Sequence, residues 1–437
     1  MLYVLYSLAL AAALAVSSPY WLYQFWRHGK YSRGFAERIG RVPARLGAFE
    51  SRVIWIHAVS VGEVLAVSRL VAEMRQAFPQ HRVVVSTTTD TGQDLARKRF
   101  GEENVFYFPL DFAFAIRPYL HALQPEIVIL AETEFWPNLL RLTASSGARI
   151  AVVNARISDR SWPRYRRFRW ALRKMLEQVD LFLAQAEQDR DRLQSIGADA
   201  TRVHVVGNLK FDVPLPPTPA IVETLRQSLA DERAFPVLVC GSTVEDEEPP
   251  LLRAFENVRV GHPRAVMILA PRHPERFDAV AILVQQLGIT LHRRSRWQSE
   301  PLASGVLLVD TIGELAALYG LADIAFVGGS LVPRGGHNII EPAQHGVAIV
   351  TGNHTENFRD IVGLFRNRDA VRIVGLAELP LILMQLAENT AERSELGRRA
   401  RETMQSQIGA TARTLDALRV LVKGESSANS AYASQKS

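Results

Sequence analysis

Hydrophobic residues in this chain fall into short, β-branched runs that alternate with longer amphipathic segments. This alternation predicts strands and helices in turn, which is typical of parallel sheets covered by helices on both faces. The expected strands form two series, 53–58, 82–88, 127–132, 150–154, 181–184 and 203–207, then 237–241, 266–271, 305–310, 324–328 and 348–351. The proline-rich segment 212–220 separates them and suits neither a helix nor a central strand. We therefore expect two doubly wound α/β domains facing each other across a cleft.

The start of the chain has a different pattern. Residues 2–26 carry no charge, whereas basic residues follow closely at Arg27, Lys30, Arg33, Arg38, Arg41 and Arg45. This order predicts a membrane anchor with its basic flank in the cytoplasm, because a cleaved signal peptide carries its positive charges before the apolar run. A helix from residue 2 to Pro19 would be about 26 Å long, slightly short of the ~30 Å hydrocarbon core. Crossing the bilayer and lying in its surface both remain open. The aromatic residues Tyr20, Trp21, Tyr23, Phe25 and Trp26 suit an interfacial belt.

Composition sets the scale of the remaining fold. With 437 residues, 48% of them hydrophobic and 22% charged, the chain can bury two cores and is not of the disordered class. We expect an anchor at 1–26, a first Rossmann-like domain at 27–211, a linker at 212–220, a second Rossmann-like domain at 221–424 and a disordered polar tail at 425–437. The net charge of +6 favours an acidic partner, without deciding between nucleic acid, anionic lipid and a phosphorylated substrate.

The segment 327–357 has the composition of an anion-binding turn. It contains Gly328, Gly329, Gly335 and Gly336. Glycines allow a close approach of the backbone to a ligand, and Asn338 is expected to open a helix whose positive end favours phosphate. Alternatively, Asn338 and Glu341 form only a capping box. In the turn 271–276, Arg272 and Arg276 suit either a phosphate or a surface ion pair. The acidic run 245–248 is expected only to complement a helix N-terminus.

Carboxylates follow the strands of the first half. Glu63 stands at the start of a helix, where it suits either dipole compensation or a general base. Glu132 and Glu134 leave another strand, and in an extended segment only one of them should face the site. The string Asp189-Arg190-Asp191 is interpreted as a solvated helix face, and the histidines lack a ligand spacing such as H-E-x-x-H. We therefore expect no metal site.

Residues 160–174 combine arginines with aromatic rings. The rings are Trp162, Tyr165, Phe168 and Trp170. Nucleic acid binds such surfaces by charge and stacking, and membranes bind them through headgroup phosphates. Because the same chain has an apolar start, a membrane is the favoured partner, with an ordinary amphipathic helix as the alternative.

Taken together, the motifs resemble those of one family, the 3-deoxy-D-manno-octulosonic acid (Kdo) transferases. The motifs that carry the resemblance run in order through almost the whole chain: HAVSVGE, STTTDTG, ETEFWPNLL, NARISDRS, NLKFD, PRHPERF, GELAALYGLADIAFVGGSL and RGGHNIIEPAQHG. Many members have Asn-Pro-Leu-Glu where this chain has Asn-Ile-Ile-Glu at 338–341, a change that backbone contacts would survive. The resemblance implies a GT-B fold and an inverting transfer of Kdo from CMP-Kdo to a phosphorylated lipid A precursor of the lipid IVA type.

The resemblance also implies roles for individual residues. Glu63 is expected to be the general base, with Glu132 and Lys210 supporting the transition state. The CMP site is expected to comprise Pro271, Arg272, Ile312, Gly313, Glu314, Asn338, Ile339, Ile340 and Glu341. No cofactor and no covalent intermediate are expected. The expected partners include inner-membrane lipids, and nucleic acid is not expected to bind. The catalytic domains are expected on the cytoplasmic side of the cell inner membrane. The alternatives are a GT-B enzyme that uses a UDP-sugar and a non-enzymatic, membrane-bound nucleotide-binding protein.

Overall fold

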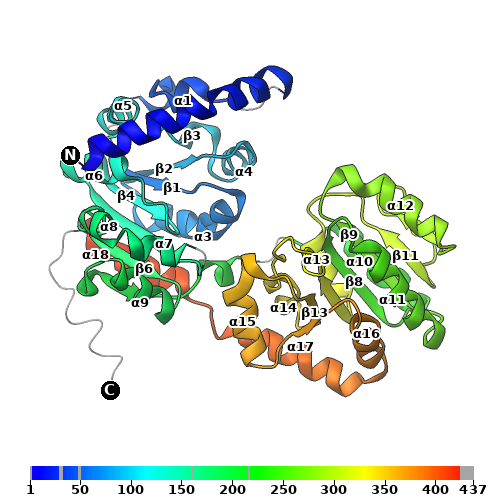
Figure 1. Ribbon diagram of the computed structural model, residues 1–437. Helices are drawn as coiled ribbons and strands as arrows, with labels where there is room; N and C mark the ends of the chain where they lie inside the picture. Colours follow the sequence, from blue (N-terminus) through cyan, green and yellow to red (C-terminus); the bar gives the residue numbers. More distant parts are fainter. Residues whose placement is uncertain (1, 29–32, 48–50, 160, 215–216, 424–437) are drawn as a thin grey trace, which may run out of the picture. The chain divides into compact units, whose positions relative to one another are not determined.

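The computed structural model describes residues 2–28, 33–47, 51–159, 161–214 and 217–423. The chain divides into two compact units, each built on its own parallel sheet (Figure 1). One unit comprises the chain up to Val213 together with the segment from Ile408 onward, and the other is Pro214–Gln407. Residues 215 and 216 of the predicted linker and the predicted disordered tail lie outside the described residues.

The sheet of the first unit has seven parallel strands in the order β3-β2-β1-β4-β5-β6-β7. Their bounds are Arg52–His57 (β1), His81–Thr87 (β2), Val105–Tyr107 (β3), Pro125–Ala131 (β4), Arg149–Ala155 (β5), Leu181–Ala184 (β6) and Val203–Val205 (β7). The strand order reverses between β1 and β4. In open parallel sheets ligands bind beyond the carboxyl ends of the strands at such a switch point.

Helices cover both faces of this sheet. The helices of this unit are α1 (Leu2–His28), α2 (Phe35–Arg38), α3 (Val61–Ala77), α4 (Asp90–Phe100), α5 (Ala113–Leu123), α6 (Pro137–Ser145), α7 (Trp162–Arg167), α8 (Arg169–Leu176), α9 (Glu187–Ser195) and α18 (Ala410–Lys423). Because side chains alternate along a strand, Trp55 packs into one core with α5, α6 and α8. Its neighbours Ile54 and Ile56 pack into the opposite core with α3, α4 and α18.

The second unit repeats the design with the parallel order β10-β11-β9-β8-β12-β13-β14. Its strands are Val237–Thr243 (β8), Val266–Pro271 (β9), Leu291–Arg293 (β10), Gly305–Leu308 (β11), Ile324–Val327 (β12), Ala348–Gly352 (β13) and Arg372–Val374 (β14). Its helices are α10 (Ala220–Asp231), α11 (Glu248–Gly261), α12 (Phe277–Gln286), α13 (Leu315–Leu318), α14 (Ile340–His345), α15 (Arg359–Asn367), α16 (Leu379–Glu388) and α17 (Thr390–Gln405). Here the reversal falls between β8 and β12.

All eleven predicted strands are present, with ends that differ by two residues at most. The sequence analysis missed β3, β10 and β14. Each has three residues and lies at an edge of its sheet, where few positions are needed and polar side chains are tolerated.

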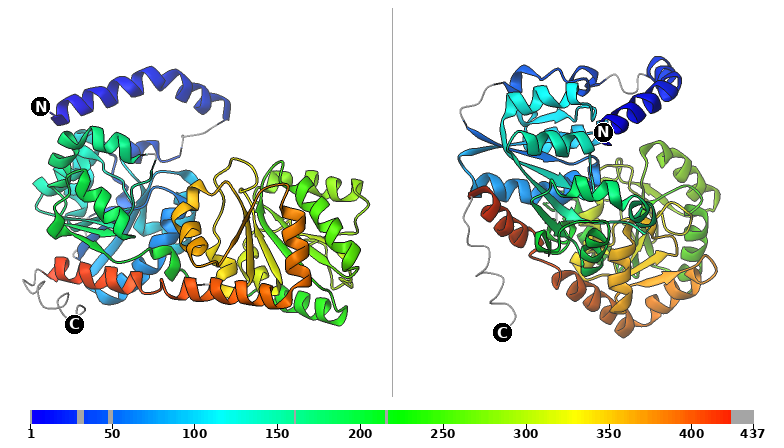
Figure 2. Two further views of the ribbon diagram at one scale, coloured as in Figure 1. Left: turned by 60° about the horizontal axis from the view of Figure 1, so that its bottom comes forward. Right: turned by 60° about the vertical axis from the view of Figure 1, so that its left-hand side comes forward.

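The predicted second domain, 221–424, differs from the structure at its carboxyl end. Helix α18 returns to the first unit, where Leu418 is fully buried against α3 and β5 (red in Figure 2). Asp212, placed in the linker by sequence, is instead buried and accepts the backbone N–H groups of Gly409 and Thr411 at the start of α18. The proline-rich part of the predicted linker therefore begins only after Asp212, which belongs to the first unit.

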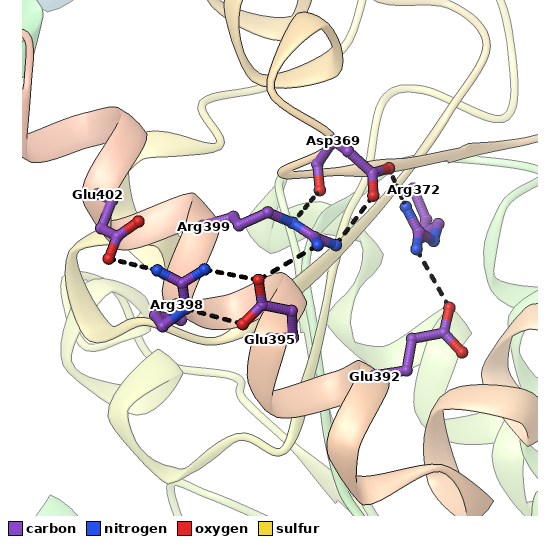
Figure 3. A network of polar contacts seen from close by, with 7 residues as sticks. All are labelled: Asp369, Arg372, Glu392, Glu395, Arg398, Arg399 and Glu402. Atoms are coloured by element: carbon purple, nitrogen blue, oxygen red, sulfur yellow. Dashed lines mark hydrogen bonds and ion pairs between the residues drawn. The ribbon is translucent and has the colours of Figure 1, made fainter.

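Helix α17 stays with the second unit through a network of ion pairs (Figure 3). Asp369, in the turn before β14, meets Arg399 of α17 at 2.9 Å, and Arg372 of β14 meets Glu392 of α17 at 3.1 Å. Single surface pairs contribute little, but a network sharing its members restricts each side chain. These contacts fix the last helix before the chain leaves this unit.

Candidate functional site

Glu63 lies in the first turn of α3, directly after β1 and therefore at the switch point of the first sheet. Its carboxylate accepts the backbone N–H of Val59 at 2.8 Å and the hydroxyl of Ser60 at 2.9 Å. Ser60 is the residue before the helix, and its own side chain does not cap it. Glu63 thus folds back over the turn, in the manner of the glutamate in a capping box, and is buried.

Burial raises the pKa of Glu63 to about 7. Nearby Glu132 raises this pKa further, whereas the bonds from Val59 and Ser60 lower it. A carboxylate with a pKa near neutrality both accepts and releases a proton at physiological pH. The electrostatics at this position therefore suit a general base better than simple dipole compensation.

Glu132 and Lys210 form an ion pair with an N–O distance of 3.0 Å, and both side chains are about three-quarters buried. Since Glu132 also acts on Glu63, the structure brings together all three residues expected to be catalytic. Glu132 has a φ of +57° directly after β4. A non-glycine residue in this region is strained by about 1–3 kcal/mol, and such strain is commonly found at functional sites.

Three amides support the loop that carries Lys210. Asn154, itself at a φ of +54°, accepts the N–H of Leu209 at 3.0 Å. Gln185 donates to the backbone oxygen of Asn154 and accepts from Asn208. Asn208 accepts the N–H of Lys210 at 2.9 Å. The NARISDRS and NLKFD motifs therefore meet in space and hold Lys210 beside Glu132.

Glu134 was not selected by the sequence analysis, which expected only one of the two carboxylates after β4 to face the site. Both Glu132 and Glu134 raise the pKa of Glu63, so both lie near it. The expectation assumed an extended segment, but β4 ends at Ala131 and Glu132 turns the chain. Burial, and to a lesser extent the charge of Glu132, raises the pKa of Glu134 as well.

In the second unit, a buried carboxylate organises the glycine-rich turn after β12. Glu247 accepts the backbone N–H groups of Gly329, Ser330 and Leu331 at 2.7–2.8 Å and that of Val244 at 3.0 Å. The acidic run that contains it was expected only to complement a helix N-terminus, so this role was missed. The turns after β8 and β12 are thereby joined at the switch point of the second sheet.

The glycines of this turn are needed for close contacts. Gly329 has a φ of +69°, and a Cβ there would lie 2.7 Å from the imidazole of His337. Its carbonyl oxygen accepts the N–H of Gly336 at 2.7 Å, which closes the loop. The N–H groups of 329–331 are bonded to Glu247, so any ligand must be held by other groups of the loop.

Helix α14 begins at Ile340, one residue later than a cap at Asn338 would give, and has six residues. The side chain of Asn338 accepts the N–H of Ile340 at 3.1 Å, which holds the chain in a turn before the helix. Ile339 is the residue before the helix, so Asn338 and Glu341 do not form the capping box considered above. They do hydrogen-bond through their side chains.

Arg272 is exposed beyond β9, and its guanidinium makes no ion pair with the residues that the structure describes. It lies near His337 and Glu341. Burial, then Arg272 and His273, lower the pKa of His337 to about 4, and burial raises the pKa of Glu341 while Arg272 opposes the rise. The Nε2 atom of His337 is buried without a partner in the described part of the chain. An unpaired guanidinium and a neutral imidazole are suitable donors to a phosphate.

The remaining predicted residues of the CMP site lie at neighbouring strand ends. Pro271 is buried at the end of β9, and Gly313 follows β11 with a φ of +93° beside Ile312, which is 80% exposed. Glu314 already accepts hydrogen bonds from Arg294 and Thr311, each at 2.6 Å. Its carboxylate therefore shapes this turn, in which Ile312 and Gly313 are the exposed residues.

Two other sequence interpretations change. Arg276, a candidate phosphate ligand, is bonded to the buried Glu248 at 2.9 Å and to Glu245 at 3.5 Å, so its role is structural. Asp189 is not on a solvated face, because it is buried and accepts the N–H of Ile157 at 3.1 Å. In the described part of the chain, no three histidine, cysteine or acidic residues are grouped as metal ligands.

Comparison with known proteins identifies the family of the chain. The family model of 3-deoxy-D-manno-octulosonic-acid transferase (kdotransferase) matches residues 33–213. The chain is 36% identical to the 3-deoxy-D-manno-octulosonic acid transferase of Bordetella pertussis, over 91% of this chain and 95% of that protein. It is 33% identical to the enzyme of the same name from Haemophilus influenzae, over 89% and 92% of the two chains.

Among solved structures, a putative UDP-N-acetylglucosamine 2-epimerase from Listeria monocytogenes aligns with a TM-score of 0.58 and 14% identity, covering 86% of this chain and 98% of that one. At this identity the likeness concerns the fold alone, which is of the GT-B type with two Rossmann-like units. The identity to the transferases extends over almost the whole length of both chains, which defines the family. The chain belongs to the 3-deoxy-D-manno-octulosonic acid transferases and is a Kdo-transferring glycosyltransferase of lipopolysaccharide synthesis.

Proposed function

We propose that this enzyme transfers Kdo from CMP-Kdo to a lipid A precursor of the lipid IVA type, with inversion at the anomeric carbon. One observation carries the proposal: Glu63, buried at a sheet switch point, has a pKa of about 7 beside the Glu132–Lys210 pair. An acceptor hydroxyl is a poor nucleophile at neutral pH, so transfer requires a carboxylate of this kind.

In the proposed reaction, the carboxylate of Glu63 takes the proton of the acceptor hydroxyl as its oxygen attacks the anomeric carbon of Kdo. The bond between that carbon and the phosphate oxygen of CMP breaks, and CMP leaves as an anion. Direct displacement inverts the centre and needs no nucleophilic side chain. The ammonium of Lys210 pairs with Glu132 and so offsets the charge of one of the carboxylates that lie near Glu63.

The second unit is proposed to bind the donor. Arg272 and the backbone at 338–341 contact the phosphate of CMP, while Pro271 and the turn 312–314 contact the nucleoside. Among the described residues, the guanidinium of Arg272 forms no ion pair and the Nε2 of His337 has no partner, which supports this assignment. The departing CMP gains negative charge, and a fixed cation stabilises that charge in the transition state.

The acceptor is amphiphilic, and we propose that the enzyme meets it at the cytoplasmic face of the cell inner membrane. Helix α1 supports membrane attachment, since Leu2–Pro19 is long and apolar enough to cross a bilayer. The basic segment 160–174 supports it as well. Its described residues include α7 and most of α8. Phe168, between the two helices, is 50% exposed and Trp170 is 64% exposed, whereas Trp162 and Tyr165 pack partly against the core.

The test is incubation of the full chain with CMP-Kdo and a lipid A precursor, followed by mass spectrometry of the lipid. We expect the acceptor to gain the mass of one or more Kdo residues. Glu63→Gln should lower kcat by ~10²- to 10⁴-fold while CMP binding stays intact. Glu73→Gln is the matched control, because Glu73 lies in the same helix and, within the described part of the chain, pairs only with exposed Arg69. Near-normal kcat in Glu63→Gln would remove Glu63 from the mechanism.

Competition identifies the donor. CMP should inhibit the reaction, whereas UMP and UDP should compete poorly. If UDP competes better than CMP, the enzyme uses a UDP-sugar, and if no lipid product forms with either donor, the transfer itself is refuted.

A further inference from the structure

The amino end of α1 is attached to the first unit by specific side-chain contacts. Ser7 accepts a hydrogen bond from the side-chain amide of Asn138 at 3.0 Å, and Tyr6 hydrogen-bonds Asp111. The guanidinium of Arg141 lies over the ring of Tyr3, 5.1 Å from its centre. All three contacts fall within the first two turns of the helix.

These contacts satisfy groups that are otherwise buried. Asn138 is 1% exposed, and its side-chain amide donates one N–H to the backbone oxygen of Asp111 at 2.6 Å and the other to Ser7. Asp111 in turn caps α6 by accepting the N–H groups of Asn138 and Leu139. If α1 moved away, the buried side-chain amide of Asn138 would lose one of its two hydrogen-bond acceptors.

The chain after α1 is attached to the same unit. Arg33 forms two parallel hydrogen bonds with Asp94 of α4, at 2.9 and 2.8 Å. A helix that crossed the membrane would place residues 3–7 on the far side of a hydrocarbon core ~30 Å thick, away from Arg33. One folded unit cannot hold both ends of such a helix, so these contacts exclude a crossing orientation.

The exposure pattern along α1 agrees with a helix that lies flat. Tyr3, Ser7, Leu10, Leu14 and Ser17 are half-buried at intervals of three and four residues, which places them on one stripe of the helix. The other side carries Val4, Leu5, Leu8 and Val16, all exposed and apolar. In Figure 2 the helix, in dark blue, lies to one side of the first unit, and its amino end (N) is the part nearest to the rest of that unit.

We propose that α1 lies in the surface of the bilayer, with its stripe against the first unit and the side of Leu8 and Val16 in lipid. The occupant of that side is the bilayer, because the helix carries no charge from residue 2 to residue 26 and a basic flank follows it for the lipid phosphates. The inference rests on the membrane association proposed above. It makes the enzyme monotopic, held at one leaflet by a helix that is part of its folded unit.

Depth measurements test the orientation. The full-length variants Leu8→Cys and Val16→Cys are labelled with bimane and bound to vesicles that contain anionic phospholipid and nitroxide-labelled lipids of known depth. Cys240 is buried, and the unaltered protein measures its background labelling. We expect the two positions, 62% and 83% exposed, to be quenched at the same shallow depth. Depths that differ by about 12 Å, the rise of eight helical residues, would mean that α1 crosses the bilayer and would overturn the inference.

Other outcomes are distinct. If the protein does not sediment with the vesicles, the proposed membrane association fails. Binding without quenching at either position means that this side of α1 is not in lipid and overturns the inference alone. A matched pair tests the attachment. Ser7→Val should speed hydrogen exchange of the first two turns of α1 several-fold, but Ser17→Val should not, because Ser17 bonds only carbonyls of its own helix. Equal exchange in the two variants would also contradict the proposal.

Discussion

The substitution Glu247→Gln tests whether the glycine-rich turn after β12 depends on a buried carboxylate. One oxygen of Glu247 accepts the N–H groups of Ser330 and Leu331, and the other accepts those of Gly329 and Val244. A glutamine has nearly the same shape, so the change introduces little steric effect. Whichever way its amide is oriented, the NH₂ group faces two donors.

The expected cost follows from this count. Two hydrogen bonds to a charged group are lost, at roughly 1.5–3 kcal/mol each, which gives ~3–6 kcal/mol before the turn relaxes. Taking the lower value, the backbone amides of 329–331 should exchange with solvent about 100-fold faster. A loss of about 3 kcal/mol should also lower the melting temperature of a unit of this size by ~6–12 °C.

Hydrogen exchange followed by mass spectrometry reads the turn directly, and calorimetry of CMP binding reads its effect on the donor site. Glu245→Gln is the matched control, because Glu245 lies in the same acidic run but its side chain is 65% exposed and meets only Arg276, at 3.5 Å. Its effect should stay below ~1 kcal/mol. If the amides of 329–331 exchange equally slowly in both variants, Glu247 does not hold the turn.

Two further predictions concern titration and charge. Because Glu63 must be deprotonated to act as a base, kcat should rise with pH through about 7 and fall about tenfold per pH unit below it, and a profile that is flat from pH 5 to 8 would contradict this role. Because the pKa of Glu63 is raised in the folded protein, its protonation also stabilises the fold, and this stabilisation is complete below pH 4.5, the ordinary pKa of the group. About 3 kcal/mol of stability should be lost as the pH rises through 7. Calorimetric unfolding should show that this pH dependence is absent in Glu63→Gln. Arg272→Ala should weaken CMP binding by about 10- to 150-fold with little change in melting temperature. Arg276→Ala should instead destabilise the protein by roughly 3 kcal/mol, because it leaves Glu248 buried and unpaired, and the reverse pattern in calorimetry would exchange the roles assigned to the two arginines.

The central strands could be predicted from sequence because their residues are buried on both faces. The run at Pro125–Ala131 is almost continuously apolar, which few other structures permit. By contrast, β10 consists of Leu291, His292 and Arg293, and three half-buried residues at an edge carry no such pattern. The return of α18 was also out of reach, since it depends on the pairing of Asp212 with N–H groups almost 200 residues later.

The site shows the same division. Glu63 and Arg272 follow strands within short motifs, so their positions could be predicted from local order. The function of Glu247 could not, because its partners are backbone groups 82–84 residues away and bear no mark in the sequence. The start of α14 was predicted one residue early, because Ile339, expected as the first helical residue, is instead the residue before the helix.

The capping of α18 by Asp212 has a consequence for how the protein is made. The second unit is one continuous stretch of chain, inserted between Asp212 and the helix that Asp212 caps. A ribosome therefore releases the whole second unit before it releases α18, whose Leu418 completes a core with α3. Domains usually fold in the order of their synthesis. Here the first unit is the first to be synthesised but the last to complete its core. Until α18 is made, the apolar side of α3 that receives it stays exposed to water or to a chaperone.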